Sequence, residues 1–238
     1  MKYLILFLAI FIFYPNVSHA ALTDNIVSYW KLDETSGSSA ADATGNGHTA
    51  ILNGTAAFDS GGKINYGIRS NTNYATLSAI SLTGDFTISG WYKPVSATPS
   101  NGNVLVGGAS SYPNLNFYAT NFRLYSGSAD TIIASYASTD QAYHFYVITR
   151  SGTTYTIYVD GSSNATATAG VFTFSVASIG GDVPGGASDA YEDEVGVWSR
   201  ALTSTEISSL YNGGAGFQLY PSVPAVNSIL SRVWSMWW

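Results

Sequence analysis

Short stretches in which apolar and polar residues alternate, separated by glycine, asparagine and serine, fill most of the chain. In the run FTISGW at 86–91, Phe86 and Ile88 would lie on one face of a strand and Trp91 on the other. The run YTIYV at 155–159 alternates in the same way. A period of two is the mark of a strand with one buried face. Many such strands between frequent turn signals predict an all-β fold, a two-sheet antiparallel sandwich.

Two glycine-containing turns are expected to join consecutive strands into hairpins. Asp160-Gly161 follows the run at 155–159, and Ser151-Gly152 precedes it. A tight type I′ turn needs positive φ at both central residues, which Asp-Gly tolerates well. The register of these hairpins should be fixed, because a slip of one residue would turn the apolar side chains toward water.

One short helix is predicted near the C-terminal end of the sandwich. Thr203 and Glu206 have the spacing of a capping box, in which each side chain accepts from the other residue's backbone N–H. Ile207 and Leu210 would share the buried face. Gly213 is expected to supply the left-handed residue that ends the helix.

The first twenty residues have the pattern of a secretory signal peptide. Lys2 precedes an apolar run that ends near Tyr14, and Ala20 closes a Ser-His-Ala sequence suited to a signal peptidase. The apolar run is shorter than the roughly 20 residues that span a bilayer. We therefore expect cleavage near Ala20 and a protein that is secreted, periplasmic or held at the cell surface. An uncleaved anchor is the alternative.

The predicted organisation is a signal peptide at 1–20, one domain at 21–220, and a linker with a short apolar tail at 221–238. No transmembrane span is expected in the mature chain. A helix over 227–238 would carry leucine, valine and tryptophan on one face, which suits contact with a membrane surface or a partner. A frayed tail, or the remnant of a longer protein, is the alternative.

Composition narrows the classes of partner. Without Lys2 the chain has eight basic side chains against fifteen acidic ones, a net charge of −7. No basic cluster occurs, so nucleic acid is not an expected partner. Cysteine is absent, which leaves packing, sheet hydrogen bonds or a bound metal to stabilise an exported protein. Abundant serine, threonine, asparagine, glycine and tyrosine suit contact with neutral glycans, and equally suit a β-sandwich without a ligand.

Several segments, in order along the chain, resemble the laminin-G-like jelly-roll domains of the concanavalin A-like lectin/glucanase superfamily. The similar segments are 27–34 (VSYWKLDE), 42–47 (DATGNG), 86–94 (FTISGWYKP), 158–161 (YVDG) and 192–214, which starts with Glu-Asp-Glu and contains the predicted helix. The resemblance covers roughly residues 26 to 214. It implies a concanavalin A-like jelly roll.

The resemblance also implies a structural calcium ion. In the family, the loop at 42–48 and the aspartate of the closing acidic segment hold the metal. Carried over, Asp42 and Asp193 would be side-chain ligands, with backbone carbonyls from Gly45, Asn46 or His48. Asp33 is a reserve candidate. The alternative is that Asp42 only makes a turn with its own backbone and Asp193 only ends a strand.

The acidic residues at 192–194 bear on catalysis. Retaining glycosidases need two carboxyl groups about 5–5.5 Å apart. In a regular strand, Glu192 and Glu194 would share a face and Asp193 would point away, which departs from the glucanase pattern. Neither His48 nor His144 has the spacing of a zinc site, and His144 is expected to be a partly buried strand residue. These patterns favour a protein that is not an enzyme.

Aromatic and amide side chains on the central strands are the candidates for ligand binding. They are Trp91, Asn116, Tyr118, Tyr125 and Tyr136. Aromatic rings cover the apolar C–H patches of sugars, and amides bond their hydroxyls. Cross-strand aromatic pairing, which stabilises a sheet without a ligand, is the alternative.

The sequence thus predicts a secreted, non-catalytic carbohydrate-binding or adhesion module stabilised by Ca²⁺, with a glycan or a surface protein as partner. Two alternatives stay open. One is a structural or protein-interaction domain of a larger surface assembly, and the other is a divergent glycoside hydrolase.

Overall fold

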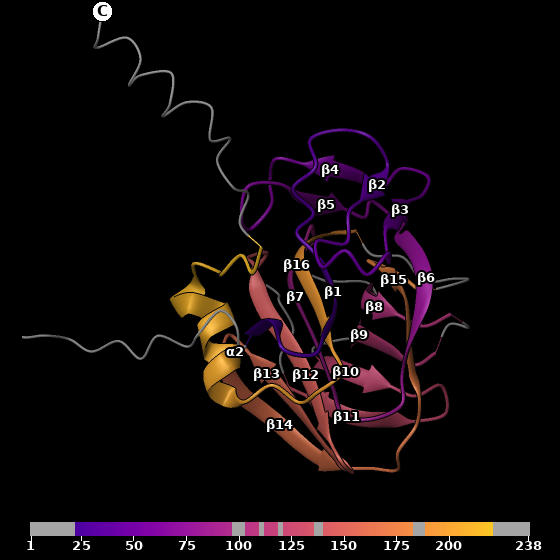
Figure 1. The fold of residues 1–238 in the computed structure, drawn as a ribbon, viewed down its shortest axis with the longest axis vertical. Coiled ribbons are helices and arrows are strands. Elements are labelled where there is room, and N and C mark those ends of the chain that lie inside the picture. Colours follow the sequence, from indigo (N-terminus) through magenta and orange to yellow (C-terminus); the bar gives the residue numbers. More distant parts are fainter. Residues whose placement is uncertain are drawn as a thin grey trace, which may run out of the picture.

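A computed structural model describes residues 22–96, 103–109, 112–118, 121–135, 140–182 and 189–220. The predicted signal peptide at 1–20 and the predicted tail at 221–238 lie outside the described residues, and so does Tyr136. Within the described part the chain forms two stacked sheets with one helix beside them (Figure 1).

The first sheet has eight strands in the order β14 (Ser162–Thr168), β13 (Thr154–Val159), β12 (His144–Ser151), β7 (Phe86–Pro94), β16 (Ala190–Trp198), β5 (Gly67–Arg69) and β4 (Ala57–Asp59), with β1 (Ile26–Trp30) also paired to β16. The second sheet has the order β11 (Asp130–Ala134), β10 (Asn121–Tyr125), β9 (Asn114–Tyr118), β8 (Asn103–Gly107), β15 (Phe174–Ile179), β6 (Ala75–Leu82), β3 (Ala50–Leu52) and β2 (Ser39–Ala40). Neighbouring strands of both sheets are antiparallel, so the predicted two-sheet sandwich is confirmed.

The main core lies between the two sheets, and strand alternation accounts for it. Phe86 and Ile88 point into this core, whereas Trp91 belongs to a second cluster on the outer face of the first sheet. Tyr155 and Ile157 alternate inward as predicted. Burial of these side chains contributes roughly 1.5–3 kcal/mol each.

Both predicted hairpins are present. β12 pairs with β13 across Gly152, and β13 pairs with β14 across a turn in which Asp160 has φ of 50° and Gly161 has φ of 76°. Positive φ at both residues is what a type I′ turn requires.

Helix α2 (Ser204–Tyr211) covers the outer face of the first sheet (Figure 1). The predicted capping box is confirmed, since Glu206 N donates to Thr203 Oγ1 at 3.3 Å and Thr203 N donates to Glu206 Oε2 at 2.8 Å. The left-handed end begins one residue before the predicted Gly213. Asn212 ends the helix with φ of 50°, a left-handed conformation that asparagine tolerates. Its side-chain Nδ2 donates to Gly216 O at 2.9 Å.

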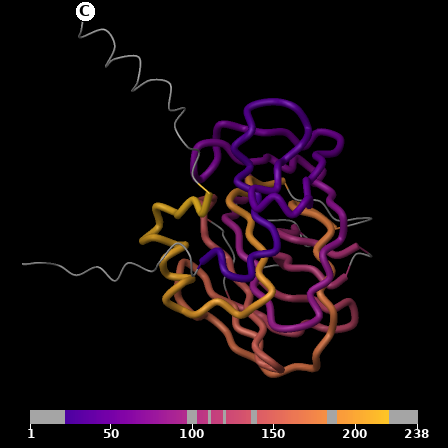
Figure 2. The backbone as a smooth tube through the Cα atoms, in the orientation of Figure 1, coloured from indigo at the N-terminus to yellow at the C-terminus, as the bar shows by residue number. Residues whose placement is uncertain are grey.

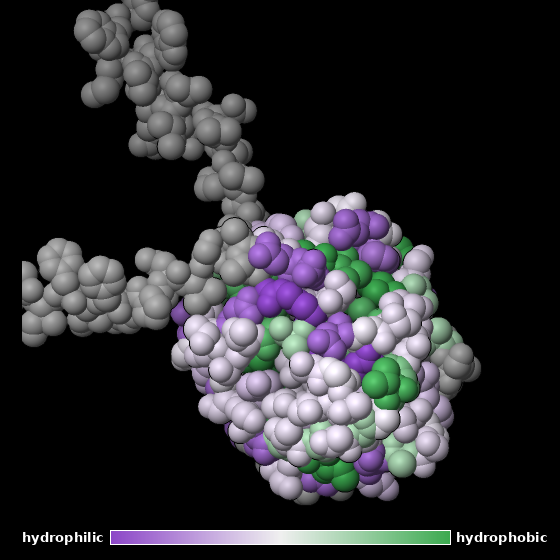
Figure 3. All heavy atoms as spheres, turned by 60° about the horizontal axis from the view of Figure 1, so that its bottom comes forward, coloured by the Kyte–Doolittle hydropathy of each residue, from purple (hydrophilic) through white to green (hydrophobic). Residues whose placement is uncertain are grey.

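The beginning and end of the described chain lie against the same face. Trp198 Nε1 donates to Leu22 O at 2.7 Å, and Leu219 N donates to Tyr29 Oη at 3.1 Å. Figure 2 shows the indigo and yellow segments on this side of the sandwich. None of the described helices is long and apolar enough to cross a membrane. The surface in Figure 3 is mostly pale, with isolated green side chains, as the serine- and threonine-rich composition suggests.

Candidate functional site

The outward side chains of β9–β11 form the most distinctive surface of the described residues. We call the group Asn116, Tyr118, Arg123, Tyr125 and Ile133 the Arg123 face. It faces away from the core because the intervening side chains point inward; these are Leu115, Phe117, Phe122, Leu124, Ile132 and Ala134.

Arg123 is the centre of this face. Its guanidinium lies 4.3 Å from the ring centroid of Tyr118 and 5.0 Å from that of Tyr125. Nε donates to Asn116 Oδ1 at 2.8 Å, and Nη1 donates to Asp130 Oδ1 at 2.7 Å. The two hydrogen bonds therefore fix the plane of the guanidinium, and cation–π contacts join it to both rings.

Large apolar side chains reach solvent at this face. Tyr112 is 46% exposed, Tyr118 44% and Ile133 45%. Tyr112 meets the ring of Tyr125 edge-on, with 5.1 Å between the ring centroids. An isolated exposed apolar residue needs no explanation, but three together with an ordered arginine indicate a surface that contacts something.

The structure thus brings together three of the predicted ligand-binding residues, Asn116, Tyr118 and Tyr125. It does not bring Trp91 to them. Trp91 is 1% exposed and lies on the other sheet, with its ring stacked on Tyr211 of α2 at 5.8 Å and tilted against Phe145 at 5.2 Å between ring centroids. Its assignment to a ligand surface is wrong, because α2 covers the face on which strand alternation had placed it.

The loop that the family resemblance assigned to calcium folds onto its own backbone. Asp42 accepts from Thr44 Oγ1 at 2.7 Å, from Ser28 Oγ at 2.9 Å and from His48 N at 3.2 Å. These bonds hold the Asp42 pKa below its usual range although burial opposes them. His48 O accepts from Trp30 Nε1 at 2.7 Å, and Asn46 Nδ2 donates to Val27 O at 2.9 Å. Gly45, at φ 79°, allows the turn.

The acidic side chains that interact with Asp193 are Asp33 and Glu194. Asp193 accepts from Ile64 N at 2.8 Å. Gln218 Nε2 donates to Asp33 Oδ2 at 2.6 Å and to Glu194 Oε1 at 2.9 Å, so two carboxylate oxygens converge on one point. Tyr29 Oη donates to Glu194 Oε2. Among the described residues, no three His, Cys, Asp or Glu side chains are already arranged around a common point as metal ligands.

Burial and like charge shape the ionisation of these acids. Burial, followed by the charge of Glu194, raises the pKa of Asp193 well above its usual range. Burial raises the pKa of Glu194 to about 8, although bonds from Tyr29 and Gln218 oppose the shift. A cation bound next to these carboxylates would lower the free-energy cost of keeping them ionised.

Glu192 lies apart from Glu194, which corrects the prediction that they share a face. Glu194 has φ of 50° in a bulge of β16, so the alternation breaks and Glu194 joins Asp193 on the outer side. Glu192 is fully buried, with Ser70 Oγ donating to Oε2 and no hydrogen-bond partner for Oε1. Burial raises its pKa well above the usual range.

His144 is a partly buried strand residue, as predicted. Its Nδ1 lies 2.6 Å from Asp160 Oδ2 and its Nε2 lies 3.1 Å from Asp140 Oδ2. The bond to Asp160 raises the pKa of His144. The ring therefore ties the start of β12 to the β13–β14 turn.

The family model for the concanavalin A-like lectin/glucanases superfamily matches residues 69–208 of this chain, more than half of its length. The chain belongs to this superfamily. The match confirms the resemblance that the sequence motifs carried, and the antiparallel sandwich fits it. No curated protein matches.

Solved structures of the lectin/glucanase fold extend the comparison. Domain 4 of AbnA, an extracellular arabinanase from Geobacillus stearothermophilus solved with arabinotriose, is 18% identical, with a TM-score of 0.63 over 78% of this chain and 97% of that one. The binding domain of Paraclostridial Mosquitocidal Protein 1 is 18% identical, with a TM-score of 0.60 over 81% of this chain and 53% of that one. Trypanosoma rangeli sialidase is 18% identical, with a TM-score of 0.59 over 82% of this chain and only 34% of that one. At this identity the likeness establishes the fold.

Sequence reasoning found the segments that contain Tyr112 and Arg123 but did not select these two residues as ligand-binding, and it missed Asp130. Arg123 and Tyr125 are two positions apart in the run NFRLY, so the strand period of two already indicated that they share a face. The pairing of β10 with β9 and β11, which sets Arg123 beside Asn116 and Ile133, is a tertiary feature that no local pattern specifies.

Proposed function

We propose that this protein is a secreted, non-catalytic module that binds carbohydrate through the Arg123 face. The observation that carries the proposal is the guanidinium of Arg123 held between the rings of Tyr118 and Tyr125, with Tyr118 open to solvent. Secretion rests on the signal-peptide pattern of the first twenty residues.

The chemistry of the face supports a glycan over other ligands. An exposed tyrosine ring covers the apolar side of a sugar, while a guanidinium bonds hydroxyls in fixed directions. Asn116, which is 5% exposed, orients Arg123 from below instead of reaching the ligand. Ligand binding costs little side-chain entropy at Arg123, because Asn116 and Asp130 already hold the guanidinium in place. The arabinanase domain with the same fold was solved with arabinotriose, which adds weight to a carbohydrate ligand.

The Tyr118→Ala variant is expected to lose glycan binding by about tenfold or more, because an exposed aromatic anchor is removed without a change in the core. The measurement is binding of the full chain to a glycan array that includes arabinotriose and sialylated glycans. Ile51→Ala is the matched control, since Ile51 is 43% exposed on β3 of the same sheet, away from the Arg123 face.

Equal loss in both variants, or no glycan signal for the unmodified protein, would contradict the proposal. If the unmodified protein gives no glycan signal but binds a surface protein, and Tyr118→Ala does not bind that protein, the protein-interaction alternative is favoured.

The placement of the acids supports a non-catalytic role. Glu192 is enclosed between the sheets beside Ser70, whereas Glu194 contacts Tyr29 and Gln218 on the outer side. A retaining glycosidase needs both carboxyl groups at one substrate. We expect no reducing-sugar release from β-glucans; release that disappears in Glu192→Gln or Glu194→Gln would contradict this.

We also propose that calcium stabilises the module next to Asp193, with Asp33 and Glu194 as the acids that join it. The support is the convergence of Asp33 and Glu194 oxygens on the Gln218 amide and the all-oxygen chemistry of the set. Asp42 is a weaker candidate because five hydrogen bonds, from its own loop and from Ser28 and Tyr29, occupy its carboxylate, whereas Asp193 accepts two. Calcium would neutralise the buried charge.

A further inference from the structure

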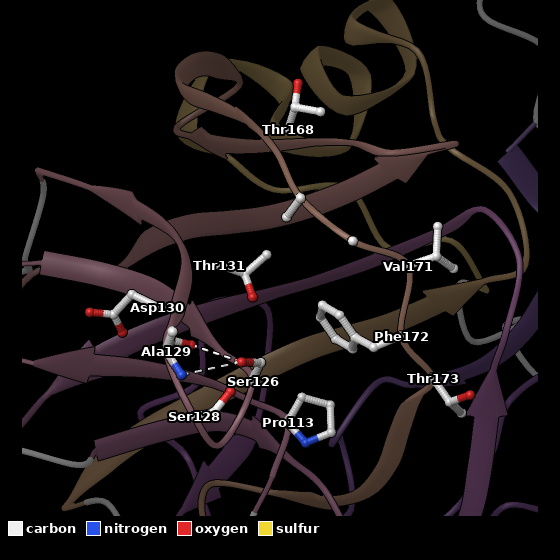
Figure 4. Close-up of a pocket in the computed structure, with 12 residues that line it drawn as sticks. Pro113, Ser126, Ser128, Ala129, Asp130, Thr131, Thr168, Val171, Phe172 and Thr173 are labelled. Atoms are coloured by element: carbon white, nitrogen blue, oxygen red, sulfur yellow. Dashed lines mark hydrogen bonds between the residues drawn. The ribbon is translucent and has the colours of Figure 1, made fainter.

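A groove lies beside the Arg123 face, between two connecting segments at one end of the sandwich (Figure 4). One wall is the β10–β11 turn with the start of β11, residues 126–131, and the other is the end of β14 with the segment that leads to β15, residues 168–173. Pro113 completes the lining. The volume of about 600 Å³ lies within the range of small-ligand sites.

The aromatic ring of Phe172 lies in this groove and is supported by Tyr155. Phe172 points toward the space between the two walls (Figure 4). It stacks on Tyr155 with 5.7 Å between centroids and 7° between planes. Arg150 Nη1 donates to Phe172 O at 2.6 Å, which fixes the backbone of the segment. The ring is therefore ordered before any ligand arrives.

The facing wall is equally ordered and carries hydroxyl groups. Ser126 N donates to Ala129 O at 3.0 Å, and Ser126 Oγ donates to the same oxygen at 2.9 Å. Hydroxyl side chains line both walls, namely those of Ser126, Ser128, Thr131, Thr168 and Thr173. One apolar ring among hydroxyl groups matches the two kinds of surface on a sugar residue.

The charges of the groove define the class of sugar. Among the described residues that line it there is no Lys, Arg or His, and Asp130 is the one charged residue. Asp130 is bonded through Oδ1 to Arg123, and in Figure 4 its carboxylate points away from Phe172. An acidic sugar, a sulfate or a phosphate would therefore find no cation in the groove and one carboxylate at its edge.

The groove and the Arg123 face share a border. Asp130 lines the groove and bonds Arg123, while Tyr125 directly precedes the turn at 126–130. Tyr112 precedes Pro113 of the groove and contacts Tyr125. A chain of sugars lying on the Arg123 face can thus continue into the groove without crossing a gap between separate elements.

We propose that this groove is a second glycan subsite, which takes a neutral sugar residue of a chain already bound at the Arg123 face. The inference rests on the proposed function and narrows its ligand to a neutral polysaccharide of several residues. Phe172 provides the stacking surface, and the threonine and serine side chains of the walls bond the hydroxyls.

The experiment is affinity electrophoresis of the full chain in native gels that contain arabinan, xylan, galactan or mannan, with polygalacturonate as the anionic comparison. Oligomers of the polysaccharide that retards the protein most are then titrated calorimetrically, a disaccharide against a hexasaccharide. The variants are Phe172→Ala, which removes the ring, and Ala129→Trp, which fills the groove from an exposed position. The second variant keeps the test valid if loss of the Tyr155 contact impairs folding in the first.

The wild type is expected to bind the hexasaccharide about tenfold more tightly than the disaccharide, and both groove variants should lose this difference while keeping disaccharide affinity. Tyr118→Ala should weaken both oligomers. If Ala129→Trp binds the hexasaccharide like the wild type while Tyr118→Ala does not, the groove proposal alone is overturned. Stronger retardation by polygalacturonate than by the neutral gels would also overturn it. If no gel retards the wild type, the groove proposal falls, and the glycan array alone decides the proposed function.

Discussion

Replacement of Arg150 by methionine is expected to lower the free energy of unfolding by about 3 kcal/mol. Arg150 is 1% exposed, and its guanidinium donates to the backbone carbonyls of Phe172, Thr83 and Gly84. Methionine fills a similar volume but offers no donor, so the carbonyl groups of Phe172, Thr83 and Gly84 lose their charged partner. The cost comes mainly from the loss of these charge-assisted hydrogen bonds, which join three segments of the fold.

Equilibrium denaturation in urea measures the effect. Arg69→Met is the matched control, since Arg69 pairs with Asp189 at 3.2 Å but its side chain is 37% exposed, and the expected loss is below about 1 kcal/mol. Equal losses in the two variants would mean that the carbonyl contacts of Arg150 contribute nothing special. Arg150→Met should also weaken hexasaccharide binding, because Phe172 loses the bond that fixes its backbone.

Saturating calcium is expected to raise the melting temperature of the wild type by about 5 to 10 °C, the shift that a ligand at a hundred times its Kd produces in a domain of this size. Asp193→Asn and Asp33→Asn should lose this shift, whatever their melting temperatures in chelator. Each removes one carboxylate from the set of Asp33, Asp193 and Glu194 while keeping the side-chain volume. Differential scanning calorimetry in calcium and in chelator measures both values.

Asp42→Asn separates the two candidate sets of ligands. Asp42 bonds Thr44 and His48 of its own loop and Ser28 of β1, so the variant should melt lower in both conditions and keep the full calcium shift. Loss of the shift in Asp42→Asn, with its retention in Asp33→Asn, would return the metal to the 42–48 loop. Identical wild-type melting in calcium and chelator would remove calcium from the proposal.

Local patterns were sufficient for the helix and the hairpins. The Thr203–Glu206 cap and the turn at Asp160 depend on residues within a few positions of each other, so the spacing of these residues in the sequence was enough to predict them. The same reasoning misjudged Glu194, because a bulge in β16 depends on how that strand pairs with β7 rather than on the acidic run itself.

The ligand candidates divide for a similar reason. Asn116, Tyr118 and Tyr125 were candidates because of their residue types, and the fold places them on one side of β9 and β10. Strand alternation could not foresee that α2 would cover the face that carries Trp91. A period of two tells which side chains share a face but not whether that face is open.

By itself the sequence determined the sandwich, the capped helix and the superfamily, because alternation, capping and turn chemistry act between near neighbours and leave readable spacings. Only the tertiary structure decided which acids meet Asp193, that Arg123 stands between two tyrosine rings, and that a groove opens beside them. These features join strands and loops that are distant in the chain, and pairing and packing across such distances follow from the whole fold rather than from any one segment.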